Sequence, residues 1–284
     1  RDVERSRGLG DVYKRQVWEM FDRHPDMLLR REHIAAARIN FESKADNLLS
    51  LADELGLPLD SMVFADDSDY EIGLCRHRLP EVAVLPLPAD RPERFVPLLR
   101  ECGLFDRLRI TEEDRSRGRY YRDDVKRRRA AVEYPDEASY TRFLQTKVEI
   151  RPADEWDIPR IAELSARTHQ CNLANTALTE AELERLCRSA SAEVLALRAS
   201  DVFGDMGLVA ACLLIFSGEQ AVIEGFWMSC RVLARGFEQQ LLETCRSRAA
   251  VRGCVLTGRY CPNGRNGRFA SFYSENGVPL LSTK

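Results

Sequence analysis

The chain has 284 residues, of which 44% are hydrophobic and 31% are charged, and its 42 basic and 45 acidic side chains leave a formal net charge of −3. This near-balance argues against a dedicated nucleic-acid binder, which normally carries a strong basic excess. No run approaches the roughly 20 apolar residues of a membrane helix, and residues 1–15 are too polar for a secretory signal. We expect a soluble, cytoplasmic protein of two domains.

The first sixteen residues carry no periodic pattern. The run GLGDVYKRQ at 8–16 resembles translated sequencing-adapter sequence. We interpret residues 1–16 as a non-native leader, with a natural flexible terminus as the alternative. On the first interpretation, genuine sequence begins near Val17 and the true N-terminus is missing.

Residues 17–105 alternate short apolar runs with helical patterns. Apolar side chains recur at the spacing of one buried helix face at Leu48, Leu51, Ala52 and Leu55. Gly56 follows as a helix stop. Ser61–Ala65 and Val82–Leu85 are strand candidates, and Glu71–Arg78 between them is a helix candidate. This alternation predicts an α/β domain with a parallel sheet.

Residues 106–145 are highly charged and helical in composition, and we expect them to form a connector. They contain the basic cluster Lys126–Arg129. The interpretation we prefer is a solvated helix face, and the alternative is a docking patch for an acidic partner.

Residues 146–284 show the pattern of an α+β domain. The expected elements are a strand at Lys147–Arg151, a helix at Asp154–Thr168, strands at Glu193–Ala199, Leu208–Phe216 and Ala221–Ser229, a helix at Arg235–Arg252 and a strand at Val255–Tyr260. Gly218 lies between two of these strands and predicts an antiparallel hairpin.

The nine cysteines are dispersed from Cys75 to Cys261 without a C-x-x-C pair, and the four histidines are scattered. Neither a zinc site nor a redox pair is therefore indicated. We expect most of the thiols to be reduced and buried in the core.

Asp66 and Asp67 directly follow an expected strand, where ligands bind in an open parallel sheet. Adjacent carboxylates repel one another unless a cation compensates, and Mg²⁺ prefers oxygen ligands. Lys44, which opens the helix that Gly56 ends, is a candidate for contacting a phosphate. The alternatives are an aspartate that caps a helix and a solvent-exposed lysine.

Several runs, in order, resemble the haloacid-dehalogenase-like domain of FkbH-type proteins. They are Val17–Phe21, His24–Met27, Ile39–Leu48, Asp60–Asp67 and Gly103–Leu108. The resemblance implies a partial Rossmann-like domain in which Lys44 is the motif lysine and Asp66 and Asp67 are acids on the Mg²⁺ side. The family's nucleophilic D-x-D strand has no counterpart, because Asp2 and Asp11 lie in the leader. We therefore expect no turnover in this domain.

The last block resembles the acetyltransferase-like (GNAT) domain of FkbH-type proteins. The matching runs are Lys147–Asp154, Thr168–Leu173, Phe203–Val209 and Met228–Gly236. The loop between a strand and a helix N-terminus suits a phosphate. By resemblance it holds coenzyme A or a carrier's phosphopantetheine through Arg231, Ala234, Arg235 and Gly236, although Ala234 stands where glycine is usual.

Cys230, beside this loop, is a candidate catalytic thiol because a helix N-terminus and an arginine favour thiolate; the alternative is a packing cysteine. Gln170 and Asn172 are candidates for orienting a thioester or amide, with turn or cap roles as the alternative. Asn266 resembles a residue beside the pantetheine. His169 and Cys171 stand where FkbH-type proteins usually show Asn and Phe.

The FkbH resemblance implies an enzyme that takes 1,3-bisphosphoglycerate, dephosphorylates it and loads a glyceryl unit onto an acyl carrier protein, toward alkoxymalonyl-type polyketide extender units. One alternative is an acetyl-CoA-dependent N-acetyltransferase. The other is a non-catalytic carrier-docking module that uses Lys126–Arg129.

Overall fold

A computed structural model describes residues 2–106 and 112–281. The chain divides into two compact units, Arg1–Val132 and Glu133–Lys284, which we call unit 1 and unit 2. The division falls inside the segment 106–145 that we expected to connect two domains. Arg107 and Leu108, at the end of one resembling run, lie outside the described residues.

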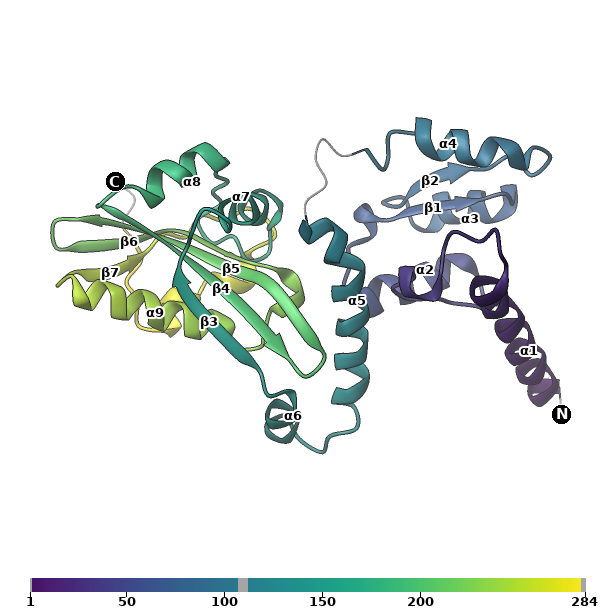
Figure 1. Ribbon diagram of the computed structural model, residues 1–284, viewed down its shortest axis with the longest axis horizontal. Helices are drawn as coiled ribbons and strands as arrows, with labels where there is room; N and C mark the ends of the chain where they lie inside the picture. The colour runs from purple at the N-terminus through teal and green to yellow at the C-terminus, as the bar shows by residue number, and fades with distance from the viewer. Residues whose placement is uncertain (1, 107–111, 282–284) are drawn as a thin grey trace. The chain divides into compact units, whose positions relative to one another are not determined.

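Unit 1 is an α/β unit with one parallel strand pair (Figure 1). Its helices and strands are α1 (Asp2–Arg23), α2 (Lys44–Leu55), β1 (Val63–Asp66), α3 (Asp69–Arg78), β2 (Ala83–Pro86), α4 (Phe95–Glu101) and α5 (Glu112–Ala131). β1 and β2 pair in parallel from Val63 with Ala83 to Asp66 with Pro86, and α3 is the crossover between them. The predicted strand–helix–strand order is thereby confirmed.

The first residues, whose sequence carries no periodic pattern, are part of α1, which is helical from Asp2 to Arg23. Apolar periodicity is not required for a helix when the run contains no proline and is rich in good helix formers such as Arg, Glu, Leu and Lys.

α2 has the predicted extent and stop. It buries Ala45, Leu48 and Ala52. Gly56 takes a left-handed conformation with φ of 64°. The N–H of Leu57 then returns to the carbonyl of Ala52 at 2.9 Å, which satisfies one of the free carbonyls at the helix end.

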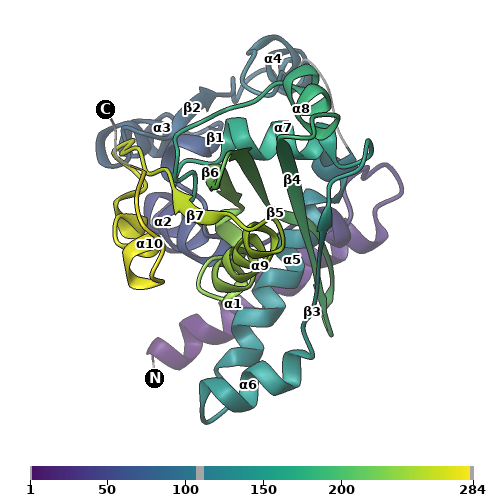
Figure 2. The same cartoon turned by 90° about the vertical axis from the view of Figure 1, so that its left-hand side faces the viewer.

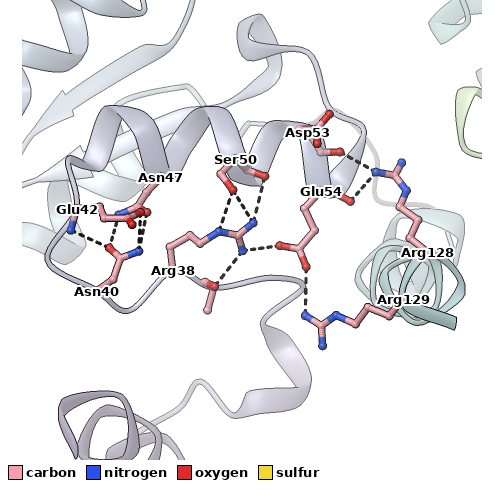
Figure 3. A network of polar contacts seen from close by, with 10 residues as sticks. Arg38, Asn40, Glu42, Asn47, Ser50, Asp53, Glu54, Arg128 and Arg129 are labelled. Carbon is pink, nitrogen blue, oxygen red and sulfur yellow. Dashed lines mark hydrogen bonds and ion pairs between the residues drawn. The ribbon is translucent and has the colours of Figure 1, made fainter. Parts of the chain in front are cut away.

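The basic cluster of α5 lies against the end of α2 (Figure 3). Arg128 donates to the carbonyl oxygens of Asp53 at 2.7 Å and Glu54 at 2.9 Å. Arg129 lies 3.3 Å from the carboxylate of Glu54, which also pairs with Arg38 at 2.5 Å. α5 thus supplies cations to the carbonyl end of α2, where the helix dipole is negative.

The expectation of a solvated face is wrong for Arg127, which is 3% exposed. Its guanidinium pairs with Asp124 at 3.2 Å. Lys126 pairs with Asp123 at 2.8 Å. All four cations of the cluster therefore contact acceptors within unit 1.

Unit 2 is built on one five-stranded mixed sheet. Its elements are α6 (Glu137–Leu144), β3 (Lys147–Pro152), α7 (Ile158–Arg167), α8 (Glu180–Cys187), β4 (Ala192–Asp201), β5 (Gly204–Ser217), β6 (Gln220–Met228), α9 (Phe237–Val251), β7 (Val255–Gly258) and α10 (Phe272–Glu275). The strand order is β3-β4-β5-β6-β7. Neighbours are antiparallel except β6 and β7, which are parallel. The fold class expected from the sequence, α/β followed by α+β, is confirmed.

The sheet of unit 2 is covered on both faces, so its central strands read as continuous apolar runs. Alternate residues face opposite sides: Leu195 and Phe226 join one core with α9, whereas Val194 and Trp227 join a second core with α7 and α8. Figure 1 shows α7 and α8 on one side of the sheet and α9 on the other, and Figure 2 shows α9 in front of the sheet.

The predicted hairpin at Gly218 is confirmed, since β5 and β6 close with Ser217 opposite Gln220. Among the described residues, α4 and α8 are further helices that the sequence analysis did not predict. For α8 a local signal existed: Thr179 and Glu182 form a capping box. Among the described residues, no helix combines the length and the apolar composition that crossing a bilayer demands.

Candidate functional site

The candidate site of unit 1 is the ion pair between Lys44 and Asp66. Lys44 is the first residue of α2 and Asp66 is the last residue of β1, 22 positions later. The Lys44 ammonium donates to Oδ2 of Asp66. The N–H of Ser68 donates to the other oxygen, Oδ1, at 2.9 Å. Both oxygens of this carboxylate therefore have a partner, as expected for a residue that is only 9% exposed.

Asp67 follows at the same end of β1 with an exposed side chain. Within the described part of the chain, its carboxylate has no hydrogen bond or ion pair. The alternative that one of the two aspartates caps the next helix is wrong, because Ser68 is the N-cap of α3 and accepts from the N–H of Glu71 at 3.4 Å. Asp66 instead fixes the turn that leads into α3 through its bond from Ser68.

The first turn of α2 is also held from α3. Arg78 donates to the carboxylate of Asp46 at 2.5 Å and to the hydroxyl of Ser43 at 3.4 Å. The hydrogen bond from Arg78 holds the pKa of Asp46 below its ordinary value. These contacts orient the helix end that presents Lys44 to Asp66.

The donor set suits Mg²⁺ in kind. No group of three His, Cys, Asp or Glu side chains poised for a metal occurs among the described residues. Mg²⁺, however, is commonly held by one or two carboxylates, with water and substrate phosphates completing its shell. Asp67 presents an unengaged, water-accessible carboxylate, and Asp66 beside it is held in place by Lys44. These residues fit an open Mg²⁺ site.

The candidate site of unit 2 is the segment from Ser229 to Gly236, which we call the anion loop. It joins β6 to α9, as expected from the sequence. Arg231 donates to the carbonyl oxygen of Met206 at 2.5 Å, and Arg235 lies 3.9 Å from the sulfur of Met206. Ala234 has φ of 62° and Gly236 has φ of 75°. An alanine thus occupies a left-handed conformation that favours glycine.

A residue that the sequence analysis missed, Glu238, lies against this loop. The N–H of Ala234 donates to Oε1 of Glu238 at 2.9 Å. Glu238 is 4% exposed, and its Oε2 is buried without a hydrogen-bond partner in the described structure. A carboxylate therefore takes one amide of the loop and repels a phosphate there. The signal was available, since Glu238 is an acidic residue in the first turn after the loop.

The two asparagines expected to contact ligand are buried and bound to the chain itself. Asn266, which is fully buried, donates to the carbonyl oxygens of Asn172 and Cys261 at 3.0 and 2.9 Å. Its Oδ1 accepts from Tyr260 and from the N–H of Asn263. Both groups of the Asn266 side-chain amide are therefore bonded within the chain in this structure.

The side-chain amide of Asn172 likewise forms its hydrogen bonds within unit 2. Its NH₂ group donates to the carbonyl oxygens of Ser165 at 3.2 Å and Thr176 at 2.8 Å, and its Oδ1 accepts from the N–H of Thr176 at 3.1 Å. This is the turn role that was left open as the alternative. Gln170 is exposed, and no hydrogen bond of its side chain occurs within the described residues.

Two cysteines near these elements differ in environment. Cys230 is exposed at the start of the anion loop. Cys171 is fully buried, and burial raises the pKa of its thiol far above the ordinary value. Cys171 is thus a core residue, whereas Cys230 remains open to reagents.

The chain matches no protein-family profile and no curated protein. It is similar to the solved N-terminal part of a Bacteroides fragilis protein containing a phosphatase domain, complexed with Mg, at 30% identity and a TM-score of 0.31. That match covers 38% of this chain and 32% of the other, so the chain spans about a third of it.

Two acetyltransferase structures are similar as well. Glucosamine-6-phosphate N-acetyltransferase from Arabidopsis thaliana matches at 16% identity and a TM-score of 0.37, covering 49% of this chain and 95% of the other. Ribosomal-protein-alanine N-acetyltransferase from Brucella melitensis matches at 19% identity and a TM-score of 0.37, covering 49% and 96%.

Proposed function

We propose that unit 1 supplies the lysine and the metal-side acids of an FkbH-like enzyme. The enzyme takes 1,3-bisphosphoglycerate and loads a glyceryl unit onto an acyl carrier protein for alkoxymalonyl-type polyketide extender units. The observation that carries the proposal is the Lys44–Asp66 pair at the carboxyl end of β1. Ligands bind at this end of strands in open α/β sheets.

Each residue has a distinct part in the proposal. Lys44 holds the Asp66 carboxylate and adds positive charge where a phosphate lies. Asp67, whose carboxylate makes no hydrogen bond or ion pair within the described residues, would hold Mg²⁺ together with Asp66, whose oxygens each keep a further lone pair beside the bonds from Lys44 and Ser68. When bound, the metal supplies charge neutralisation for an acyl phosphate. The substrate class and the carrier come from the resemblance, and the pair geometry supports a phosphate-handling site.

The proposal assigns binding, and not turnover, to this chain. By resemblance, the attacking aspartate belongs to a D-x-D strand that has no counterpart in the sequence. Without an attacking carboxylate, no covalent intermediate forms. We therefore expect phosphoglycerate and Mg²⁺ to bind without release of phosphate.

Isothermal titration with 3-phosphoglycerate in the presence of Mg²⁺ tests the site. Lys44→Met and Asp67→Asn are each expected to weaken binding by about tenfold or more, which corresponds to about 1.4 kcal/mol. Glu81→Gln is the matched control, because Glu81 is exposed beside the opposite, amino-terminal end of β2. Equal affinities in all four proteins would remove the proposal. Mg²⁺-dependent phosphate release that Asp66→Asn abolishes would contradict the expected lack of turnover.

A further inference from the structure

An arm such as the pantetheine of coenzyme A is extended, carries two amide bonds and ends in phosphate. To lie beside the anion loop it needs a free strand edge leading to that loop, as an extended peptide does when it adds to a sheet. In unit 2 the strand that leads to the loop is β6, which ends at Met228 directly before Ser229. The state of the β6 edge therefore decides whether such an arm fits.

One edge of β6 pairs with β5, and the other pairs with β7 only over its first half. The parallel pairing runs from Gln220 with Val255 to Ile223 with Gly258. It stops at Glu224, where β6 carries a bulge: Leu213 faces Gly225 while Leu214 faces Ile223. Beyond the bulge, β6 and the chain after β7 diverge and leave an edge that another extended segment can use.

That edge is already occupied by the chain itself. The N–H of Met228 donates to the carbonyl oxygen of Cys171 at 3.0 Å, and the N–H of Leu173 donates to that of Phe226 at 3.2 Å. Asn172 and Trp227 form an antiparallel bridge. We call Cys171–Leu173 the insert strand.

The insert strand also reaches the far side of the divergence. The N–H of Cys261, which follows β7, donates to the carbonyl oxygen of Leu173 at 2.8 Å. The side chain of Asn266 donates to the carbonyl oxygen of Asn172 at 3.0 Å. The insert strand therefore spans the gap between β6 and the chain beyond β7, and its backbone bonds are made on both sides.

Burial identifies the insert strand as part of the core and not as a surface lid. Cys171 and Leu173 are both 0% exposed and belong to the same core as Phe226 and Met228. Beside the anion loop, Glu238 of α9 places a buried carboxylate, whose sign is wrong for a phosphate, against the N–H of Ala234.

We infer that unit 2 does not hold coenzyme A or a carrier's phosphopantetheine at the anion loop, because the insert strand fills the β6 edge that the arm requires. The coenzyme-A-dependent acetyltransferase alternative therefore does not fit this chain. The inference concerns unit 2 alone and stands apart from the function proposed for unit 1.

Alkylation of native cysteines tests this in the full chain. Cys230 in the anion loop and Cys187 on α8 are both exposed, so each reports on its surroundings while the other serves as internal control. Iodoacetamide labelling, followed by peptide mass spectrometry, is carried out with and without millimolar desulfo-coenzyme A, which has no thiol. We expect the labelling rate of Cys230 relative to Cys187 to change less than twofold. Saturable protection of Cys230 alone overturns the inference.

Glu238→Gln separates the insert strand from the charge. This variant removes the repelling carboxylate but leaves the insert strand on β6, so desulfo-coenzyme A should still not protect Cys230. Protection in Glu238→Gln would show that the charge, and not the insert strand, excludes the arm, and would overturn the inference.

Hydrogen exchange checks the insert strand without any ligand. The amides that join the insert strand to β6, the N–H of Leu173 and the N–H of Met228, should exchange as slowly as those of the β5–β6 pair. Asn266→Ala should accelerate exchange of the Leu173 amide by about tenfold, while the β5–β6 amides keep their rates. Exchange of the Leu173 and Met228 amides within seconds in the unaltered chain would mean that the edge is open, and the inference would fail.

Discussion

The carboxylate of Asp157 lies 2.8 Å from the guanidinium of Arg198. Asp157 is the N-cap residue of α7 and is fully buried, while Arg198 belongs to β4. Arg151 of β3 approaches the other carboxylate oxygen at 2.7 Å. One buried charge thus connects a helix to two strands of unit 2, and two cations compensate for its burial.

Asp157 should make unit 2 acid-sensitive. Burial raises the pKa of this carboxyl, but the hydrogen bonds from Arg198 and from the N–H of Asp154 outweigh it, so the net pKa lies below the ordinary value. A lowered folded-state pKa gives stability that is present above the unfolded value of about 3.9 and is lost as the pH falls from there through the folded value. Urea unfolding followed by tryptophan fluorescence should show this loss below about pH 4.

The substitution Asp157→Asn tests the assignment. It should lower the free energy of unfolding at pH 7 by about 1.5–3 kcal/mol, the range for a hydrogen bond to a charged group. The loss should not be larger, because both arginines remain partly exposed to water. The substitution should also flatten the pH dependence below about pH 4. Glu219→Gln, in the exposed turn between β5 and β6, should change neither quantity. An unchanged acid transition in Asp157→Asn would rule out this residue as its source.

Gly56→Ala should destabilise unit 1. Gly56 has φ of +64°, and an added Cβ would lie 2.8 Å from Nη2 of Arg128. We expect a cost of about 1–2 kcal/mol from the left-handed backbone, measured by urea unfolding followed by circular dichroism. Gly73→Ala is the control, because Gly73 lies inside α3 with nothing within 4 Å of its Cβ position. Gly73→Ala should raise the free energy of unfolding by about 0.5–1 kcal/mol. If both substitutions change the free energy of unfolding by the same amount in the same direction, the conformational argument is wrong.

Arg128→Gln should destabilise unit 1 by about 0.5–1.5 kcal/mol, because it removes two hydrogen bonds to the carbonyls that end α2. Arg76→Gln, at an exposed position in the last turn of α3, should stay within about 0.5 kcal/mol. The same urea transitions measure both. If Arg128→Gln is neutral, the carbonyls of α2 do not depend on α5.

This prediction also affects tests of the basic cluster as a docking patch. Charge reversal of Lys126–Arg129 would break contacts within unit 1, including the buried pair of Arg127 with Asp124. Loss of carrier binding in such a variant would therefore need a stability measurement beside it before it could be assigned to docking.

Gly225→Ala should be the most damaging glycine substitution in unit 2. An added Cβ would lie 2.2 Å from the ring of Trp227, which is fully buried and cannot move aside freely. Overpacking of this kind costs typically about 1–3 kcal/mol. Gly267→Ala, with nothing within 4 Å of the Cβ position, is the matched control. Urea unfolding at neutral pH compares the two, and equal midpoints would show that Trp227 has room to shift.

Local sequence signals predicted most of the elements. The apolar spacing from Leu48 to Leu55 and the stop at Gly56 correspond to α2, and the run around Val63 corresponds to β1. Each of these elements depends on residues that are close together in the sequence, so a short stretch of sequence is enough to predict it. The strand pattern placed Asp66 at the carboxyl end of β1, whereas the grouping of Lys44 with Asp66 was implied by the FkbH resemblance and not by the spacing of the residues.

The insert strand of unit 2 lay beyond such reasoning. The residues Cys171–Leu173 show no alternation, since all three are buried. Their partners are Phe226 and Met228 on β6 and Asn266, which is 94 positions from Asn172. The bulge at Glu224, which frees the edge of β6, has no local marker apart from Gly225.

The sequence alone therefore determined the fold class, the positions of most helices and strands, and the presence of two acids at the end of β1, whereas the contact of Lys44 with Asp66 depends on how α2 packs beside β1. Only the tertiary structure decided that Glu238 accepts an N–H of the anion loop, that the side-chain amide of Asn266 bonds within the chain, and that the cations of the basic cluster of α5 have partners in unit 1. Propensity and periodicity act over a few residues, whereas a hydrogen bond is decided by whichever donor and acceptor the folded chain brings within about 3 Å.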